Sequence, residues 1–212
     1  ALQELIKNKL TTVQRVEMAN DYSDENTILN KILKGDIDNI RETLEEIDGE
    51  AFQEAVSRLL KARKIYILGM RTSFVVAQYL GFYLGIILDN VHTVRMDMGD
   101  AFEQIVRIGE DDVVIAFSFP RYSKKSFQLV KYAKEKGAKV ISITDSLFAP
   151  IASVSDNTLI VKSNMASFVD SLVPAMSVAN ALAVAVGMKE KEDIKEHFDD
   201  LEQMWDKYGM FE

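Results

Sequence analysis

Short apolar runs alternate with segments of helical periodicity from Lys64 to the end of the chain. The apolar runs are KIYILG, VHTVRM, DVVIAFSF, KVISIT and NTLIVK, and they lack a strict alternation of apolar and polar positions. Strands of this kind are typically buried on both faces, in a parallel sheet that helices cover. The pattern therefore predicts an α/β fold, with a five-stranded parallel sheet flanked by helices on both faces.

Apolar residues at helical spacing predict the elements that surround this sheet. Helices are expected over residues 74–88, 100–108, 123–136, 168–186 and 189–208. Two further helices precede the first strand, one over residues 28–47 and one that follows Asp48 and Gly49. Both have an acidic face and an apolar face, so we expect them to cover another part of the molecule.

The first 26 residues differ from the rest of the chain. Residues 1–16 show the pattern of the late part of an amphipathic helix, without an initial methionine, and the polar segment ANDYSDENT then breaks the periodicity. We therefore divide the chain into residues 1–26, a linker with a helix remnant, and residues 27–212, a single domain with one core. A chain that opens in mid-pattern is expected to be a fragment of a longer protein.

The 212 residues include no cysteine and two histidines. The lack of cysteine excludes disulfides, zinc–thiolate sites and cysteine nucleophiles, and it fits a reducing, cytoplasmic setting. The two longest uncharged runs, residues 72–88 and 171–188, are shorter than the roughly 20 residues that a membrane span needs, so both are expected to be buried helices. We expect a cytoplasmic protein without metal, cofactor or membrane contact.

The net charge of −8 argues against a nucleic-acid surface on this chain. Seven basic residues and one acidic residue nevertheless lie between Arg121 and Val140. The lysines from Lys131 onward fit a solvated helix face near a C-terminus, where the helix dipole favours them. Arg121, Lys124 and Lys125 instead follow a strand directly, and this is where open parallel sheets bind ligands.

Three loops that follow predicted strands offer hydroxyl side chains and backbone N–H groups just before a helix, and two of them also carry an arginine. Such loops favour anions, because helix N-termini present unpaired N–H donors and the positive end of the helix dipole. The candidate ligand-binding residues are Gly69, Arg71, Thr72, Ser73, Ser118, Arg121, Tyr122, Ser123, Lys124 and Asp145. Ser73 and Ser123 would also serve as ordinary helix N-caps, and Asp145 as a cap or turn residue. Arg71 and Arg121 together suggest bidentate recognition of an anion.

Residues 51–186 resemble the sugar isomerase (SIS) domain family, above all in VVIAFSFPRYSKKSFQLVKYAKEKGAKVISITDS. The resemblance implies a flavodoxin- or Rossmann-like three-layer sandwich that binds phosphorylated sugars and dimerises. The leader LQELIKNKLTTVQRV is similar to the segment that follows the helix-turn-helix domain in bacterial regulators of the RpiR type. Residues 1–26 would then follow a missing DNA-binding domain, and residues 27–212 would bind the effector.

The phosphate loop departs from the family pattern. The pattern Ser-x-Ser-Gly-x-Thr falls on Ser118, Pro120, Arg121 and Ser123, so that proline replaces one serine and arginine replaces the glycine. In the earlier loop, Gly-x-Gly-x-Ser becomes Gly69-Met70-Arg71-Thr72-Ser73, with a second arginine for glycine. The resemblance therefore implies a phosphate loop rebuilt around arginine and tyrosine, and the class of the ligand stays open.

Three functions follow from these observations. The leading hypothesis is the effector-sensing, dimerising domain of an RpiR-type transcription regulator, not an enzyme, which binds a phosphorylated sugar or a similar anionic metabolite. It would form a homodimer or higher oligomer and contact DNA only through the missing N-terminal domain. The alternative is a ketose/aldose phosphate isomerase, but Glu103 and Asp170 are weak candidates for its general base, and no catalytic residue is assigned. The third is a dimerisation module whose pocket Arg71, Arg121 and Tyr122 fill.

Overall fold

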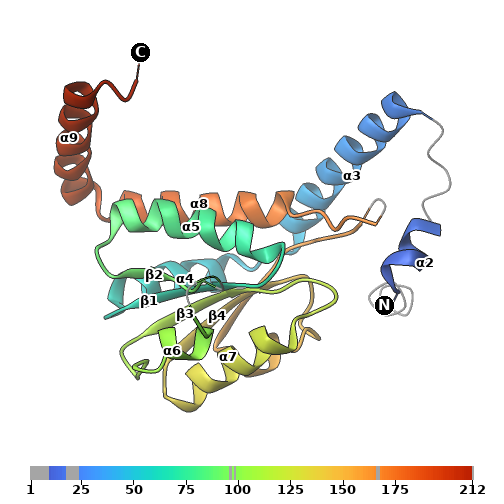
Figure 1. The fold of residues 1–212 in the computed structure, drawn as a ribbon, viewed down its shortest axis with the longest axis horizontal. Helices are drawn as coiled ribbons and strands as arrows, with labels where there is room; N and C mark the ends of the chain where they lie inside the picture. Colours follow the sequence, from blue (N-terminus) through green and yellow to red (C-terminus); the bar gives the residue numbers. More distant parts are fainter. Residues whose placement is uncertain (1–9, 18–23, 96, 98, 166–167, 212) are drawn as a thin grey trace.

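Five parallel strands form a single open sheet, as the sequence predicts (Figure 1). The structure, a computed structural model, describes residues 10–17, 24–95, 97, 99–165 and 168–211. The strands are β1 (Ile65–Gly69), β2 (Val91–Thr93), β3 (Val113–Phe117), β4 (Lys139–Thr144) and β5 (Asn157–Ile160). Their spatial order is β2-β1-β3-β4-β5, so the chain changes direction across the sheet between β1 and β3.

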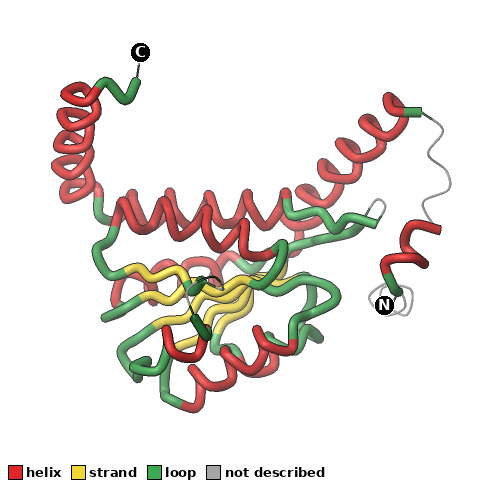
Figure 2. Tube along the Cα trace, in the orientation of Figure 1, coloured by secondary structure: helices red, strands yellow, loops and turns green. Residues whose placement is uncertain are grey.

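Helices cover both faces of the sheet, which confirms the three-layer sandwich (Figures 1 and 2). One face packs against α4 (Gly49–Lys61), α5 (Ser73–Ile87) and α8 (Val173–Lys189). The other face packs against α6 (Ala101–Gln104) and α7 (Lys124–Glu135). Successive residues of a strand serve opposite layers, with Ile67 in the first core and Tyr66 in the second. This two-sided burial explains the apolar sequences of β1 and β3, in which every residue is buried, whereas β2 at the edge of the sheet is partly exposed.

Two helices differ from the boundaries that periodicity predicts. The helix expected from residue 100 ends at Gln104 and continues as turns, with the N–H of Ile108 donating to the carbonyl of Ile105. The helix expected from residue 168 begins at Val173, with Pro174 in its first turn, where a proline loses no helical hydrogen bond. The stretch 161–172 is therefore a connection between β5 and α8.

Helix α3 (Glu25–Glu46) contradicts the expected packing of its apolar face. Ile28, Leu29, Leu33, Ile37, Ile40 and Leu44 are exposed and Ile32 is half-buried, whereas Asn39 and Thr43 are buried. Asn39 donates from Nδ2 to the carbonyl of Asn164 (3.0 Å) and accepts from its N–H (3.1 Å). The helix is thus held through polar side chains, and its apolar face is left open. The expected burial does hold for α4, where Val56 and Leu59 are in the core.

The remaining helices are α2 (Thr12–Glu17) and α9 (Lys191–Tyr208). Figure 1 shows α3 and α9 rising from opposite ends of the layer formed by α5 and α8, both on the side away from the sheet. Phe82 and Tyr83 of α5 are exposed on this layer. Within the described residues, no helix combines the length and the apolar character needed to cross a bilayer.

Candidate functional site

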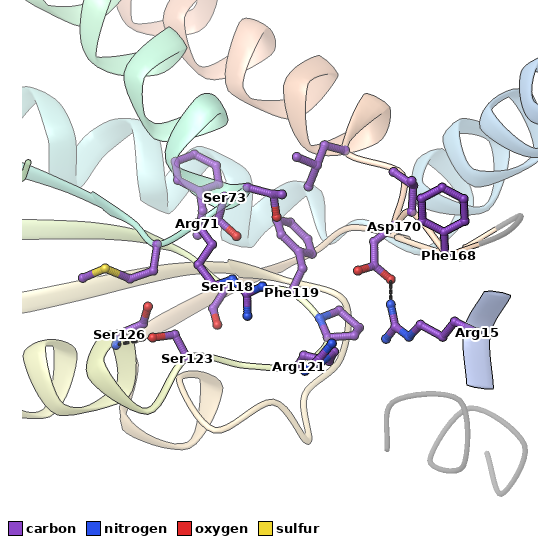
Figure 3. A pocket seen from close by; sticks show the side chains of 16 residues that line it. Arg15, Arg71, Ser73, Ser118, Phe119, Arg121, Ser123, Ser126, Phe168 and Asp170 are labelled. Carbon is purple, nitrogen blue, oxygen red and sulfur yellow. Dashed lines mark hydrogen bonds and ion pairs between the residues drawn. The ribbon is translucent and has the colours of Figure 1, made fainter. Parts of the chain in front are cut away.

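A cavity of about 300 Å³ lies beyond the carboxyl ends of β1 and β3, at the point where the strand order reverses (Figure 3). Gly69 and Phe117 are register partners at the ends of these two strands, so the loops that follow them start side by side. Open α/β sheets bind their ligands at such a switch point. The cavity volume is at the lower end of the range of small-molecule sites, about 300–1,000 Å³.

The cavity brings together six of the ten candidate residues that the sequence suggests. These are Arg71, Thr72, Ser73, Ser118, Arg121 and Ser123. The other four, Gly69, Tyr122, Lys124 and Asp145, lie outside its lining. Two further segments complete the wall, the part of the β5–α8 connection from Phe168 to Leu172 and a side chain of the leader, Arg15.

The loop after β1 depends on the close approach of two backbone segments. A Cβ on Gly69 would lie 2.4 Å from the carbonyl oxygen of Ser73, so only glycine fits there. Ser73 is the first residue of α5 and is buried, while Thr72 occupies the cap position without a side-chain cap bond. Ser73 is therefore not the N-cap of this helix, and it sits in the cavity wall instead.

The loop after β3 is anchored to β4. The N–H of Ser118 donates to the carbonyl of Ile143 (3.2 Å), and Thr144 Oγ1 donates to the carbonyl of Ser118 (2.7 Å). At the other end of the loop, Ser123 is the N-cap of α7 and accepts a hydrogen bond from the N–H of Ser126 (3.3 Å). The N-cap interpretation of Ser123 is thus confirmed, and the cap places this residue beside the cavity.

Arg71 and Arg121 both have a left-handed backbone, with φ of 55° and 62°. These are the positions where the resemblance places glycine, and this conformation costs a residue with a Cβ about 1–2 kcal/mol. Strain of this kind tends to persist at functional sites. Two strained arginines at the wall of one cavity are therefore candidates for ligand recognition through their guanidinium groups.

Three polar lining residues are not among the ten ligand-binding candidates, although one of them, Asp170, is also the weak general-base candidate of the isomerase alternative. Ser126 lies in the first turn of α7, three residues after the N-cap Ser123. It is 1% exposed, and its Oγ has no partner among the described residues. Arg15 and Asp170 form an ion pair of 2.9 Å across 155 positions of sequence. Ser126 follows the predicted cap Ser123 by three residues, and this spacing could have indicated that both lie at the same end of α7, beside the cavity. No local signal connects Arg15 with Asp170.

Tyr122 and Asp145 brace the loop after β3 from outside the cavity. The hydroxyl of Tyr122 donates to Asp145 Oδ1 (2.8 Å), and Thr144 Oγ1 lies 3.3 Å from the same oxygen. Burial raises the pKa of Asp145, and the hydrogen bond from Tyr122 acts in the opposite direction. Burial and the nearby Asp145 charge also raise the pKa of Tyr122. Asp145 therefore binds a hydroxyl, but one of the protein itself.

Replacing Asp145 by asparagine is expected to change how stability depends on pH. Because the pKa of Asp145 is raised by burial, the folded state holds this proton more tightly than the unfolded state, whose pKa is about 3.9. The stability of the wild type should therefore fall, relative to Asp145→Asn, as the pH rises from about 3.9 through the raised pKa. Urea unfolding of both proteins across this pH range measures the difference between their free energies of unfolding. A difference that does not depend on pH would contradict the raised pKa of Asp145.

No cluster of three or more His, Cys, Asp or Glu residues that could hold a metal ion occurs in the part of the chain that the structure describes. The chemistry of the cavity wall is instead that of guanidinium groups, hydroxyl groups and one carboxyl group, Asp170. This set of donors can bind an oxyanion and the hydroxyl groups of an attached polar ligand.

Comparison with known proteins gives a consistent result. A family model described as SIS domain matches residues 58–185. An uncharacterized HTH-type transcriptional regulator of Clostridium perfringens is 24% identical over 160 residues, which cover 74% of this chain and 56% of the relative. This chain spans about half the length of the curated relatives that it matches first.

Solved structures share the fold. The sugar isomerase domain of an RpiR transcription factor from Sphaerobacter thermophilus superposes with a TM-score of 0.76 at 24% identity, over 81% of this chain and 96% of that one. The NanR protein of Vibrio vulnificus, solved in complex with ManNAc-6P, gives a TM-score of 0.74 at 20% identity, over 92% of this chain and 73% of that one. Other neighbours with this fold include a protein described as a putative sugar-phosphate isomerase from Listeria monocytogenes.

Proposed function

The chain belongs to the SIS domain family, and we propose that it is the effector-binding domain of an RpiR-type transcription regulator whose effector is a phosphorylated sugar or a similar anionic metabolite. One observation carries the proposal. Arg15, Arg71 and Arg121 line a cavity at the switch point of the sheet, where the described lining includes one carboxyl group, Asp170. This excess of positive charge stands out in a chain with a net charge of −8.

The wall of the cavity suits a phosphate group. Each guanidinium offers several N–H donors in a fixed fork that matches the oxygens of a phosphate. The N-terminus of α7 adds its dipole, and Ser126 adds a buried hydroxyl group. The name of the Vibrio vulnificus neighbour includes a phosphorylated amino sugar, and the curated relatives are named HTH-type transcriptional regulators. Both descriptions support a sensor of phosphorylated sugars.

Thermal unfolding with a panel of phosphorylated sugars tests this function. A ligand at about 100 times its Kd should stabilise the folded chain by about 2.7 kcal/mol, which raises the Tm of a domain of this size by about 5–10 °C. The panel contains hexose and amino-sugar 6-phosphates, including ManNAc-6P, each paired with its unphosphorylated sugar. The unphosphorylated sugars should leave the Tm unchanged. Equal shifts from both members of each pair would refute the recognition of an anion.

A sugar-phosphate isomerase is the alternative on the same fold. Isomerisation needs a general base that takes a proton next to the carbonyl group of the sugar. Among the described residues that line the cavity, Asp170 carries the one carboxyl group. One oxygen of this group already forms an ion pair with Arg15. We therefore propose binding without catalysis. Interconversion of a ketose and an aldose phosphate by the purified chain, abolished in Asp170→Asn, would favour the enzyme.

We further propose that two chains associate through a surface made of the outer side of α5 and α8 together with the exposed apolar face of α3. Six apolar side chains of α3 are exposed, and Phe82 and Val184 are 64% and 57% exposed on α5 and α8. Large exposed apolar surfaces of this kind mark interaction sites. The matched regions cover 56% and 47% of the first two curated relatives, which are therefore longer than this chain. In such a longer regulator, DNA would be read by a separate domain, and residues 1–26 would link it to the effector domain.

A further inference from the structure

The leader segment reaches the ligand cavity through one buried side chain. Arg15 of α2 is 4% exposed, and its Nη1 donates to Asp170 Oδ1 at 2.9 Å. In Figure 3 the two side chains point toward each other at the edge of the cavity, with α2 on one side and the β5–α8 connection on the other. The contact joins residues that are 155 positions apart, so it fixes the leader to the domain at the cavity itself.

Arg15 has a donor that no described residue satisfies. Its Nε is buried and has no hydrogen-bond partner among the described residues, although Arg15 is part of the cavity wall. A buried donor without an acceptor costs free energy, and each such case in a folded protein calls for an explanation. An oxygen of a ligand in the cavity would satisfy this donor while Asp170 keeps its own hydrogen bond.

Two of the three arginines, Arg15 and Arg121, interact electrostatically with the carboxyl group of Asp170. Its carboxylate pairs with Arg15, and the charge of Arg121 also acts on it. A second residue of the same connection, Ser171, donates from Oγ to Asp36 of α3 (2.6 Å). The connection is therefore attached to α2 on the side of the cavity and to α3 on its other side.

More polar contacts attach the same connection to α3. The N–H of Lys162 donates to Thr43 Oγ1 (2.9 Å), and Asn164 exchanges two hydrogen bonds with Asn39. Lys162, Asn164, Asp170 and Ser171 of this connection thus contact α2 or α3. Phe168, Val169, Asp170 and Leu172 of the same connection line the cavity. A ligand that contacts the β5–α8 connection is therefore one contact away from α2, through the pair of Asp170 and Arg15.

We propose that Arg15 is a ligand-binding residue, the third arginine of the site, and that an anion bound to it locks α2 onto the β5–α8 connection. The inference rests on the proposed function and adds to it a route from the cavity to the leader. Ligand binding adds contacts to α2 without requiring a change in the sheet. The leader is then held more firmly when the site is filled, and a domain attached to it would be held with it.

Inorganic phosphate is the probe for the test, because it carries the group that all the proposed ligands share. The variant Arg15→Gln removes the charge and the fork, and it should weaken phosphate binding about tenfold or more in calorimetry. Arg41→Gln is the matched control, since Arg41 makes an exposed pair with Asp38 on α3 and does not line the cavity. Its affinity for phosphate should equal that of the wild type.

Hydrogen exchange of residues 12–17 provides the second readout. Phosphate should slow the exchange of this segment in the wild type and in Arg41→Gln, and it should have no effect there in Arg15→Gln. Arg15→Lys keeps the charge but loses the fork, so it should bind with an intermediate affinity and replaces Arg15→Gln if the latter fails to fold.

The outcomes separate the inference from the function on which it rests. If Arg15→Gln binds phosphate as tightly as the wild type, or if phosphate leaves the exchange of residues 12–17 unchanged in a wild type that binds it, Arg15 is not a ligand-binding residue and the inference fails alone. If the wild type does not bind phosphate at all, the recognition of an anion by the cavity fails, and both the proposed function and the inference fall.

Discussion

Replacing Arg121 by glycine is expected to stabilise the ligand-free chain and, at the same time, to weaken its binding of phosphorylated sugars about tenfold or more. The gain in stability follows from the backbone. Arg121 has φ of 62°, a conformation that glycine adopts without the steric cost of a Cβ. The loss of affinity follows from the guanidinium, because hydrogen bonds to charged groups contribute about 1.5–3 kcal/mol each.

The variant Arg121→Ala separates the two effects. It removes the same guanidinium but keeps the Cβ, so it should lose as much affinity as Arg121→Gly and show none of the relief of strain. The free energy of unfolding should therefore be about 1–2 kcal/mol higher for the glycine variant than for the alanine variant. Urea unfolding gives this difference, and calorimetric titration with the phosphorylated sugar that shifts the Tm most gives the affinities.

The opposite result has a clear meaning. If Arg121 filled the cavity instead of binding a ligand there, its removal would open space, and binding would strengthen or appear for the first time. Either result would remove Arg121 from the site. The same comparison applies to Arg71, whose φ of 55° predicts the same relief of strain in Arg71→Gly relative to Arg71→Ala.

A single glutamate in the proposed interface is expected to convert the dimer into a monomer. Phe82 and Ile37 are 64% and 54% exposed in the single chain, so a charge at either position should leave its fold intact. In a symmetric dimer each substitution occurs twice and places a carboxylate in an apolar contact, at a cost of several kcal/mol. Since 1.4 kcal/mol corresponds to a tenfold change in Kd, the dimer should weaken at least a hundredfold in Phe82→Glu and in Ile37→Glu.

Light scattering at micromolar concentration measures this effect. The wild type should give about twice the chain mass of 23.9 kDa, and each variant should give the mass of one chain. Val106→Glu is the control, because Val106 is 58% exposed and follows α6 on the opposite face of the sheet. It should stay dimeric. A monomeric wild type, or dimers that persist in both interface variants, would contradict the proposed surface.

The sequence predicts the sheet well because its information is local. The central strands β1 and β3 are runs of residues buried on both faces, and burial of this kind needs no knowledge of the neighbouring strand. The loops after β1 and β3 were also recognisable, because ligand-binding residues follow strands in such sheets. The structure places six of the candidates found in this way in the cavity wall, namely Arg71, Thr72, Ser73, Ser118, Arg121 and Ser123.

The strand order, the left-handed backbone of the two arginines and the orphaned hydroxyl of Ser126 required the structure. Periodicity shows that α5 and α7 exist, but it does not show which side chains of their first turns face a cavity. Tyr122 and Asp145 illustrate this limit. Both follow strands, yet they pair with each other outside the cavity lining, because a side chain after a strand can turn to either side of its loop.

By itself, then, the sequence determined the layers of this protein and the two loops that carry its arginines, since both follow from the burial and the chemistry of neighbouring residues. Only the tertiary structure shows which side of α3 is buried and which residue of α2 contacts the rest of the domain. The pattern of α3 shows that an apolar face exists, and only the packing shows that this face is exposed while Asn39 and Thr43 are buried. The pairing of Arg15 with Asp170 depends on how the β5–α8 connection is placed against α2, and a contact between residues 155 positions apart leaves no trace in the local pattern of either segment.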